Sequence, residues 1–228
     1  MLAGSASFYQ QMKIKTLYFN PLRECCHIVW SEPSRECVIL DPGCYDRGEF
    51  SRLERFVTEE NLHPAGILLT HGHFDHIFGL SWAREKWDVP VMMHPDDSYQ
   101  IRISGMFAAA LELDFTPYTG DFKNIAEGDT VTFGADSLTV LHTPGHTAGC
   151  VCFYSEPEKL LFSGDTLFQG SVGRTDHPKG DFQTLLQSID RLAQLPDDTR
   201  VYPGHGYPTT IADERRTNPF FPENRQRR

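Results

Sequence analysis

A dense group of metal-ligand side chains stands between Thr70 and His76. The segment reads Thr-His-Gly-His-Phe-Asp-His, so three imidazoles and one carboxylate lie close together in the chain. Imidazole and carboxylate are the ligands that suit zinc, iron and manganese in proteins. Because the chain has only 10 histidines in 228 residues, this clustering indicates a metal site and not a loop of unrelated histidines.

The spacing within this group indicates two neighbouring ions. His71 and His73 alternate, so they can share one side of an extended loop, while Asp75 and His76 turn toward another. Four ligands so close in sequence do not comfortably surround one tetrahedral ion. Each ion therefore needs further ligands, and three candidates stand in strand-end loops that contain Gly or Pro: His146, Asp165 and His205.

Short apolar runs and helical periodicities surround these loops. The pattern predicts helices over 49–62, 79–87, 96–114 and 181–195, the first with Phe50, Leu53 and Val57 on one face and a stop at His63-Pro64. It predicts strands over 13–19, 26–31, 36–41, 66–70, 89–94, 130–134, 137–144, 150–155, 159–165 and 200–206. This order indicates a mixed α and β protein, but periodicity alone does not determine the topology.

The composition argues against some binding partners and indicates where in the cell the protein is found. A net charge of −10 argues against nucleic acid and against anionic membrane surfaces, and no apolar run is long enough to span a bilayer. Residues 1–11 lack the features of a secretory signal and are interpreted as a disordered arm or tag remnant, with one domain over 12–228. We therefore expect a cytoplasmic protein with six reduced cysteines. The polar tail over 219–228 is expected to be loosely held.

The pattern H-x-H-x-D-H, followed by a distal His, Asp and His, resembles the ligand pattern of the metallo-β-lactamase superfamily, from Asp41 to His205. The resemblance implies an α+β fold, a four-layer αββα sandwich with the site at one edge between the sheets. It implies two divalent ions, zinc in the first place and iron or manganese as alternatives. The implied roles are these: His71, His73 and His146 bind the first ion, Asp75, His76 and His205 the second, Asp165 bridges both, and Asp41 supports the ligands.

Individual residues separate the branches of this superfamily. Phe74 stands where the flavodiiron oxygen reductases carry a glutamate, and a bridging Asp165 counts against true β-lactamases. The short acidic chain counts against the tRNA-processing nucleases. The segments 170–176 and 203–210 resemble the short, single-domain (type II) glyoxalase II proteins, which are hydroxyacylglutathione hydrolases. Lactonases and persulfide dioxygenases remain as alternatives.

The resemblance therefore implies a metallohydrolase that cleaves a small-molecule thioester such as S-lactoylglutathione. In that hypothesis two bound ions would lower the pKa of a water molecule toward neutrality, and Asp75 would orient the resulting hydroxide toward the carbonyl or take its proton. Arg174 and Tyr207 fall where glyoxalase II enzymes contact the glutathione portion, although Arg174 is equally expected to pair with Asp176.

Two further alternatives stay open at this point. A persulfide dioxygenase needs only one iron, held by His71, His146 and Asp165, so the ligands alone do not separate the two activities. A fold of this kind can also serve as a binding module without catalysis. The remaining histidines, among them His94 and His177, are expected to be isolated, and His142 to support His146.

Overall fold

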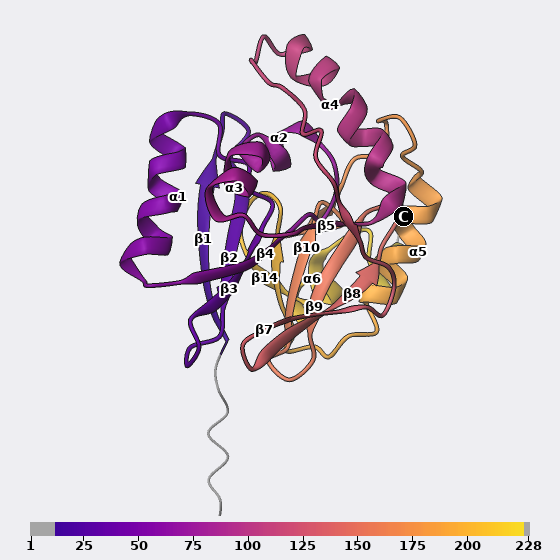
Figure 1. The fold of residues 1–228 in the computed structure, drawn as a ribbon. Coiled ribbons are helices and arrows are strands. Elements are labelled where there is room, and N and C mark those ends of the chain that lie inside the picture. Colours follow the sequence, from indigo (N-terminus) through magenta and orange to yellow (C-terminus); the bar gives the residue numbers. More distant parts are fainter. Residues whose placement is uncertain (1–11, 226–228) are drawn as a thin grey trace, which may run out of the picture.

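Two six-stranded sheets lie face to face in the computed structural model, which describes residues 12–225 (Figure 1). Residues 1–11, interpreted above as an arm or tag remnant, lie outside the described residues. The first sheet has the strand order β1 (Lys13–Phe19), β2 (Glu24–Trp30), β3 (Glu36–Leu40), β4 (His63–Leu68), β5 (Val91–Met93) and β6 (Lys123–Asn124). The second has the order β14 (Thr209–Thr210), β13 (Arg200–Pro203), β10 (Leu160–Gly164), β9 (Val151–Ser155), β8 (Asp136–His142) and β7 (Thr130–Phe133).

Helices cover the outer faces of both sheets. On the first sheet they are α1 (Arg47–Glu59), α2 (Phe74–Ile77), α3 (Leu80–Trp87), the 3₁₀ turn η1 (Pro95–Asp97) and α4 (Ser98–Ala110). On the second they are α5 (Phe182–Leu192), α6 (Ile211–Thr217) and α7 (Pro222–Arg225), and a small hairpin joins β11 (Leu167–Phe168) to β12 (Ser171–Val172). The expected α+β, four-layer αββα sandwich is therefore confirmed.

The alternation of side chains along the strands produces the layers. In β3, Val38 and Leu40 point between the sheets and pack with Phe153 and Phe162, while Ile39 points outward to the cluster under α1. Both faces of the strand are buried, as its unbroken apolar run predicts. The first sheet is thus covered on both sides, and the polar residues Asp41 and Thr70 follow the carboxyl ends of β3 and β4.

The predicted elements exist, but several boundaries move. The first helix is α1, whose start is set by Asp46, because its Oδ1 accepts a hydrogen bond from the Glu49 N–H at 2.9 Å. His63 and Pro64 begin β4 and do not end the helix, so the expected strand over 66–70 was placed too late. The helix expected over 96–114 is η1 followed by α4, which ends at Ala110.

The expectation of a loose tail was wrong over the described residues 219–225. Phe221 is fully buried in the cluster that α5 and α6 form on the second sheet. Arg225 donates to the carbonyl of Leu186 at 3.1 Å, which ties α7 to α5. The mostly polar composition of this segment did not indicate that Phe221 would be buried.

All six cysteines are buried and carry free thiols. No helix among residues 12–225 is long and apolar enough to cross a membrane.

Strand direction brings the candidate ligands to one edge. β3 and β4 are parallel, and so are β10 and β13. The carboxyl ends of these strands lead to Asp41, to the loop that begins at His71, to Asp165 and to His205. β8 runs in the same direction as β10, because both pair antiparallel with β9, and His146 lies in the loop after it. One edge of the sandwich therefore collects every candidate ligand.

Candidate metal centre

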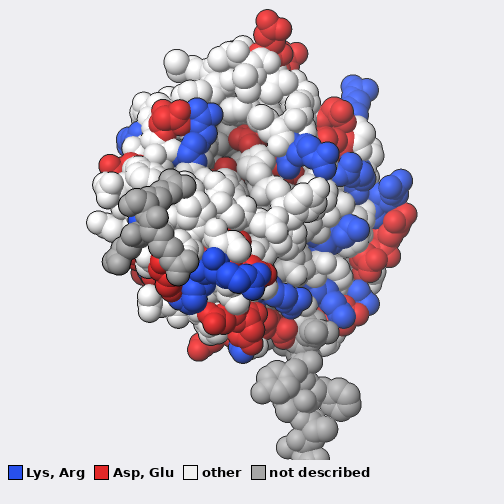
Figure 2. Space-filling view, turned by 180° about the vertical axis from the view of Figure 1, so that it is seen from behind, with Lys and Arg blue, Asp and Glu red and all other residues white. Residues whose placement is uncertain are grey.

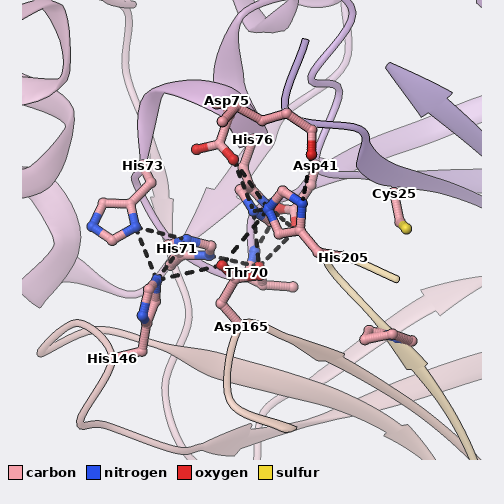
Figure 3. A network of polar contacts seen from close by, with 12 residues as sticks. Cys25, Asp41, Thr70, His71, His73, Asp75, His76, His146, Asp165 and His205 are labelled. Carbon is pink, nitrogen blue, oxygen red and sulfur yellow. Dashed lines mark hydrogen bonds and ion pairs between the residues drawn. The ribbon is translucent and has the colours of Figure 1, made fainter. Parts of the chain in front are cut away.

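His71, His73 and His146 bring three ring nitrogens together. The Nε2 atom of His71 lies 3.1 Å from His73 Nδ1 and 3.3 Å from His146 Nε2, and these last two atoms are 2.9 Å apart. Figure 3 shows the three rings around a common point. In a tetrahedral zinc site with Zn–N bonds of about 2.0–2.1 Å, ligand nitrogens lie about 3.3 Å apart. The three histidines are therefore spaced like ligands of one ion.

Asp75, His76 and His205 form a second group beside the first. The Nε2 atom of His205 lies 3.1 Å from Asp75 Oδ2 and 3.3 Å from His76 Nε2. Asp165 lies between the groups, with Oδ1 3.4 Å from His76 Nε2 and Oδ2 3.6 Å from His146 Nε2 (Figure 3). One carboxylate thus faces both groups, which is the arrangement that a bridging ligand requires.

The donor set fits two divalent cations. Asp165 is only 8% exposed, and its Oδ1 atom accepts no hydrogen bond from the described residues. A buried carboxylate oxygen without a donor is costly, and ring nitrogens that face one another at about 3 Å repel through their lone pairs unless a proton or cation lies between them. Gly204 leaves the necessary room, because a Cβ there would lie 2.4 Å from Asp165 Oδ1.

Hydrogen bonds from outside the centre set the tautomers of the ligands. The Oδ1 atom of Asp41 accepts from the Thr70 N–H at 2.8 Å, and its Oδ2 accepts from the Thr70 hydroxyl at 2.6 Å. Asp41 Oδ2 also lies 3.0 Å from His76 Nδ1, and Thr70 Oγ1 lies 3.0 Å from His71 Nδ1. Since both ring Nδ1–H groups donate to oxygen, the Nε2 atoms of His71 and His76 face the centre. Asp41 thus contacts Thr70 and His76 from the side away from the centre.

Two backbone carbonyls orient the remaining Nε2 ligands in the same way. His146 Nδ1 lies 2.6 Å from the carbonyl oxygen of Arg174, and His205 Nδ1 lies 3.2 Å from that of Leu22. His73 is the exception, because it turns Nδ1 toward the centre and leaves its Nε2 without a hydrogen-bond partner among the described residues. Five imidazoles therefore present one nitrogen each to the same small space.

Asp97 holds two ligand loops together, and sequence reasoning missed it. Its side chain is fully buried, and its Oδ2 accepts from the Gly72 N–H at 2.7 Å and from the Thr147 hydroxyl at 2.9 Å. Its Oδ1 accepts from the Gly149 N–H at 2.7 Å. Gly72 lies between two ligands of the first group, and Thr147 follows the third. The only signal in the sequence was an acidic residue at the start of a predicted helix, which has a common explanation as a helix cap.

The two groups of ligands differ in charge when no ion is bound. Burial and the neighbouring rings hold the pKa of His71 and of His73 well below the ordinary 6.5. Burial also opposes charge on His76, but Asp165 and Asp75 outweigh it and raise the pKa of His76 well above 6.5. The same balance, with burial outweighed by Asp165 and Asp75, raises the pKa of His205. Near neutral pH His71 and His73 therefore offer free lone pairs, whereas protons are favoured on His76 and His205.

Metal binding should consequently occur in two steps that respond differently to pH. An ion at the second group must displace protons from His76 and His205, whereas His71 and His73 are already neutral. Between pH 6 and pH 8 we expect the affinity for the ion at the second group to rise roughly tenfold per pH unit for each proton released. The affinity for the ion at the first group should change little. Calorimetric titration of chelator-treated protein with Zn²⁺ at several pH values measures the affinities of the two binding steps. Equal pH slopes for the two steps would contradict this assignment.

A cavity of about 740 Å³ lies over the ligands, and five of them line it: His73, Asp75, His146, Asp165 and His205. Figure 2 shows a hollow with acidic atoms in its depth and mainly uncharged surface around it. Arg174 lines the same cavity, but its Nε and Nη2 both donate to the Asp176 carboxylate at 2.6 Å, so the expected pairing is present. Tyr207 is 68% exposed and is not among the residues that line the cavity.

The expectations for three other histidines, His94, His142 and His177, were wrong. His177 is not isolated, because it lines the cavity with its ring centroid 4.8 Å from that of His73. His142 does not support His146, because its Nε2 lies 3.0 Å from the Ala148 carbonyl and its ring stacks on His94. These stacked rings are 4.1 Å apart and nearly parallel, so one ion cannot lie in the plane of both. The pair therefore does not form a second metal centre in this arrangement.

Comparisons with known proteins agree with this geometry. A family model described as the metallo-beta-lactamase superfamily matches residues 26–205. The probable metallo-hydrolase YqgX of Bacillus subtilis is 36% identical over 212 residues, covering 92% of this chain and 98% of that protein. The hydroxyacylglutathione hydrolase GloC of Haemophilus influenzae is 34% identical over 213 residues, with the same coverage of 92% and 98%.

Two solved structures are similar over nearly the whole chain. The B3 metallo-beta-lactamase BLEG-1 has a TM-score of 0.84 and 34% identity, covering 92% of this chain and 100% of that one. TTHA1623, crystallised in a di-iron-bound form, has a TM-score of 0.82 and 39% identity, covering 91% and 100%. Together with the family model, which spans most of the sequence, these similarities establish that the chain belongs to the metallo-β-lactamase superfamily.

Proposed function

We propose that this protein is a metallohydrolase that cleaves a thioester, such as S-lactoylglutathione, at a centre of two divalent ions. Zinc is the first candidate, and iron and manganese are the alternatives. The observation that carries the proposal is the position of Asp165, whose two oxygens face two separate groups of ligands. The name of one relative, hydroxyacylglutathione hydrolase GloC, and the di-iron form of TTHA1623 support the substrate class and the number of ions.

The side chains of the centre suit hydrolysis. Two bound divalent ions would lower the pKa of a water molecule and polarise a carbonyl oxygen. Burial raises the pKa of Asp75, but His76 and His205 outweigh it and keep the pKa below its ordinary 3.8, so Asp75 is an ionised acceptor on the cavity wall. Its carboxylate can therefore orient the attacking water or accept its proton. A thiolate is a good leaving group, so no strong general acid is required.

A count of ions together with an assay tests the proposal. We would purify the protein without chelator, measure metal per chain by elemental analysis, and assay the same sample on S-lactoylglutathione. About two ions per chain with thioester hydrolysis supports the proposal. About one iron per chain, with oxygen uptake on glutathione persulfide and no hydrolysis, supports the dioxygenase alternative. A β-lactam substrate belongs in the same panel, because BLEG-1 bears a β-lactamase name.

A His205→Ala variant distinguishes two-ion thioester hydrolysis from the one-iron dioxygenase alternative more sharply. His205 belongs only to the second group, whereas a mononuclear iron site would use His71, His146 and Asp165. We expect the substitution to lower kcat/KM for the thioester on the order of a hundredfold or more, since it removes a ligand. His63→Ala, which changes an exposed histidine at the start of β4, is the matched control and should leave the rate unchanged. Full thioester hydrolysis by His205→Ala would rule out the two-ion mechanism.

A further inference from the structure

Once the candidate ligands are set aside, most of the side chains that wall the cavity are apolar. Apart from the ligands, its wall includes Leu22, Phe74, Phe107, Leu111, Phe168 and Val172. Leu22 and Leu111 are 41% and 54% exposed, so they offer apolar surface that nothing in the described chain covers. An apolar wall around a few polar groups is the usual composition of a site that binds a small molecule by burying its carbon chain.

The polar part of the wall offers little to hold an anionic group. Arg174 is the one lysine or arginine among the described residues that line the cavity. Its Nε and Nη2 both donate to Asp176, and this bidentate pair cancels the charge of Arg174. Tyr207, the other residue expected to contact a glutathione portion, lies outside the wall. Among the described residues of this wall, a charged thiol carrier therefore meets no unpaired cation.

The apolar side chains of the wall lie on several elements, and two of them, Phe168 and Val172, lie on the β11–β12 hairpin that leads into the Arg174 loop. Arg174 and Asp176 lie in the exposed loop after β12, whereas Phe107 lies on the last turns of α4 and Leu111 directly after them. A thiol carrier with polar groups keeps its water most easily near the exposed polar loop, since burial of unpaired polar groups is costly. Phe107 and Leu111 are four residues apart at the end of α4, so they form one apolar surface against which an acyl chain can pack.

We propose that the cavity selects thioesters by an apolar acyl chain that packs against Phe107 and Leu111, and that it does not select the thiol by charge. This inference rests on the proposed thioester hydrolysis, but it concerns binding and is testable without turnover. It predicts tight binding of thioesters with medium-length hydrocarbon acyl groups, whether or not the thiol is glutathione.

The first test compares unreactive S-alkyl analogues by calorimetry on the metal-loaded protein. The four ligands are the S-methyl and S-hexyl derivatives of glutathione and of N-acetylcysteamine, which is an uncharged thiol. We expect each S-hexyl compound to bind at least about thirtyfold more tightly than its S-methyl counterpart, because each buried methylene contributes up to about fourfold. We expect the two S-hexyl compounds to bind within about threefold of each other. An S-methylglutathione that binds as tightly as S-hexylglutathione, or a preference of more than about tenfold for the glutathione compound, overturns the proposal.

Two substitutions on neighbouring positions test the α4 wall. Leu111→Ser removes exposed apolar surface from the cavity, whereas Met106→Ser removes it from a residue that is 73% exposed and outside the cavity wall. Neither side chain is buried, so neither change should unfold the protein. We expect Leu111→Ser to lower the S-hexyl to S-methyl ratio about fivefold and Met106→Ser to leave it unchanged. Equal effects of the two variants contradict the assigned wall.

Asp176→Asn tests the charge argument. The variant releases Arg174 from its partner, and an exposed cation near an anion gains about fivefold in affinity in water. We therefore expect the preference for S-hexylglutathione over its uncharged counterpart to rise about fivefold, and an unchanged ratio contradicts the role given to the pair. These binding results are separate from the proposed function: a protein that binds the S-hexyl compounds as expected but hydrolyses no thioester would refute only the activity.

Discussion

Replacing Asp165 by alanine is expected to lower thioester hydrolysis on the order of a thousandfold and to reduce the metal content from about two ions per chain to one or fewer. The reason is the position of its carboxylate, which lies 3.4 Å from His76 Nε2 and 3.6 Å from His146 Nε2. No other described carboxylate contacts both groups of ligands in this way. Elemental analysis and kcat/KM on the same preparation measure the two losses together.

The same substitution should also change the stability of the metal-free protein. Burial disfavours the Asp165 carboxylate, but His205 and His76 outweigh burial and hold its pKa well below the ordinary 3.8. A carboxyl whose pKa is lower in the folded state stabilises the fold at pH values above the unfolded pKa, and this contribution is lost as the pH falls. Chelator-treated Asp165→Ala should therefore melt at a lower temperature than the parent at pH 6, with a smaller difference near pH 3.

Asp198→Asn is a suitable control for both measurements. Asp198 pairs with Lys159 on the surface and is largely exposed, so its loss should change neither the metal content nor the rate. Retention of two ions and of the parental rate by Asp165→Ala would show that this carboxylate does not bridge the centre.

Asp97→Asn is expected to have the second largest effect, although Asp97 is not placed as a ligand. Its two oxygens accept from Gly72, Thr147 and Gly149, which belong to two different ligand loops. An amide in the same position turns an N–H group toward at least one of these donors. We expect a loss of about 2 kcal/mol in the free energy of unfolding and a 10- to 100-fold loss of affinity for the first ion.

The neighbouring Asp96→Asn variant makes a matched control, because the Asp96 side chain is 61% exposed and lies one residue away. Denaturant unfolding of the metal-free proteins and metal titration of both variants measure the two effects. Parental metal affinity in Asp97→Asn would show that the two loops keep their positions without this carboxylate. A loss of metal affinity that is confined to the His71, His73 and His146 group is the specific result expected of a residue that positions these loops.

The sequence alone indicated the centre because its signals are local. Three histidines and an aspartate within one short loop are improbable without a metal, and His146, Asp165 and His205 each follow an apolar strand. The carboxyl ends of parallel strands meet at one edge of a sheet, so residues at such ends can converge even when they lie far apart in the chain. The four-layer fold came from the resemblance that these residues carry and was confirmed by the family and the structure.

Only the tertiary structure decided which residues support and surround the centre. Asp97 acts on Gly72 and Gly149, which are 25 and 52 residues away, and Phe221 anchors a tail whose composition is polar. His177 reaches the cavity through a loop without periodicity, and Arg174 proved to be paired with Asp176. Apart from the expected Arg174–Asp176 pair, contacts of this kind join residues that are distant in the chain and of common types. Such contacts correspond to no recognisable pattern in the sequence, because they form only when distant segments of the chain pack together in the fold.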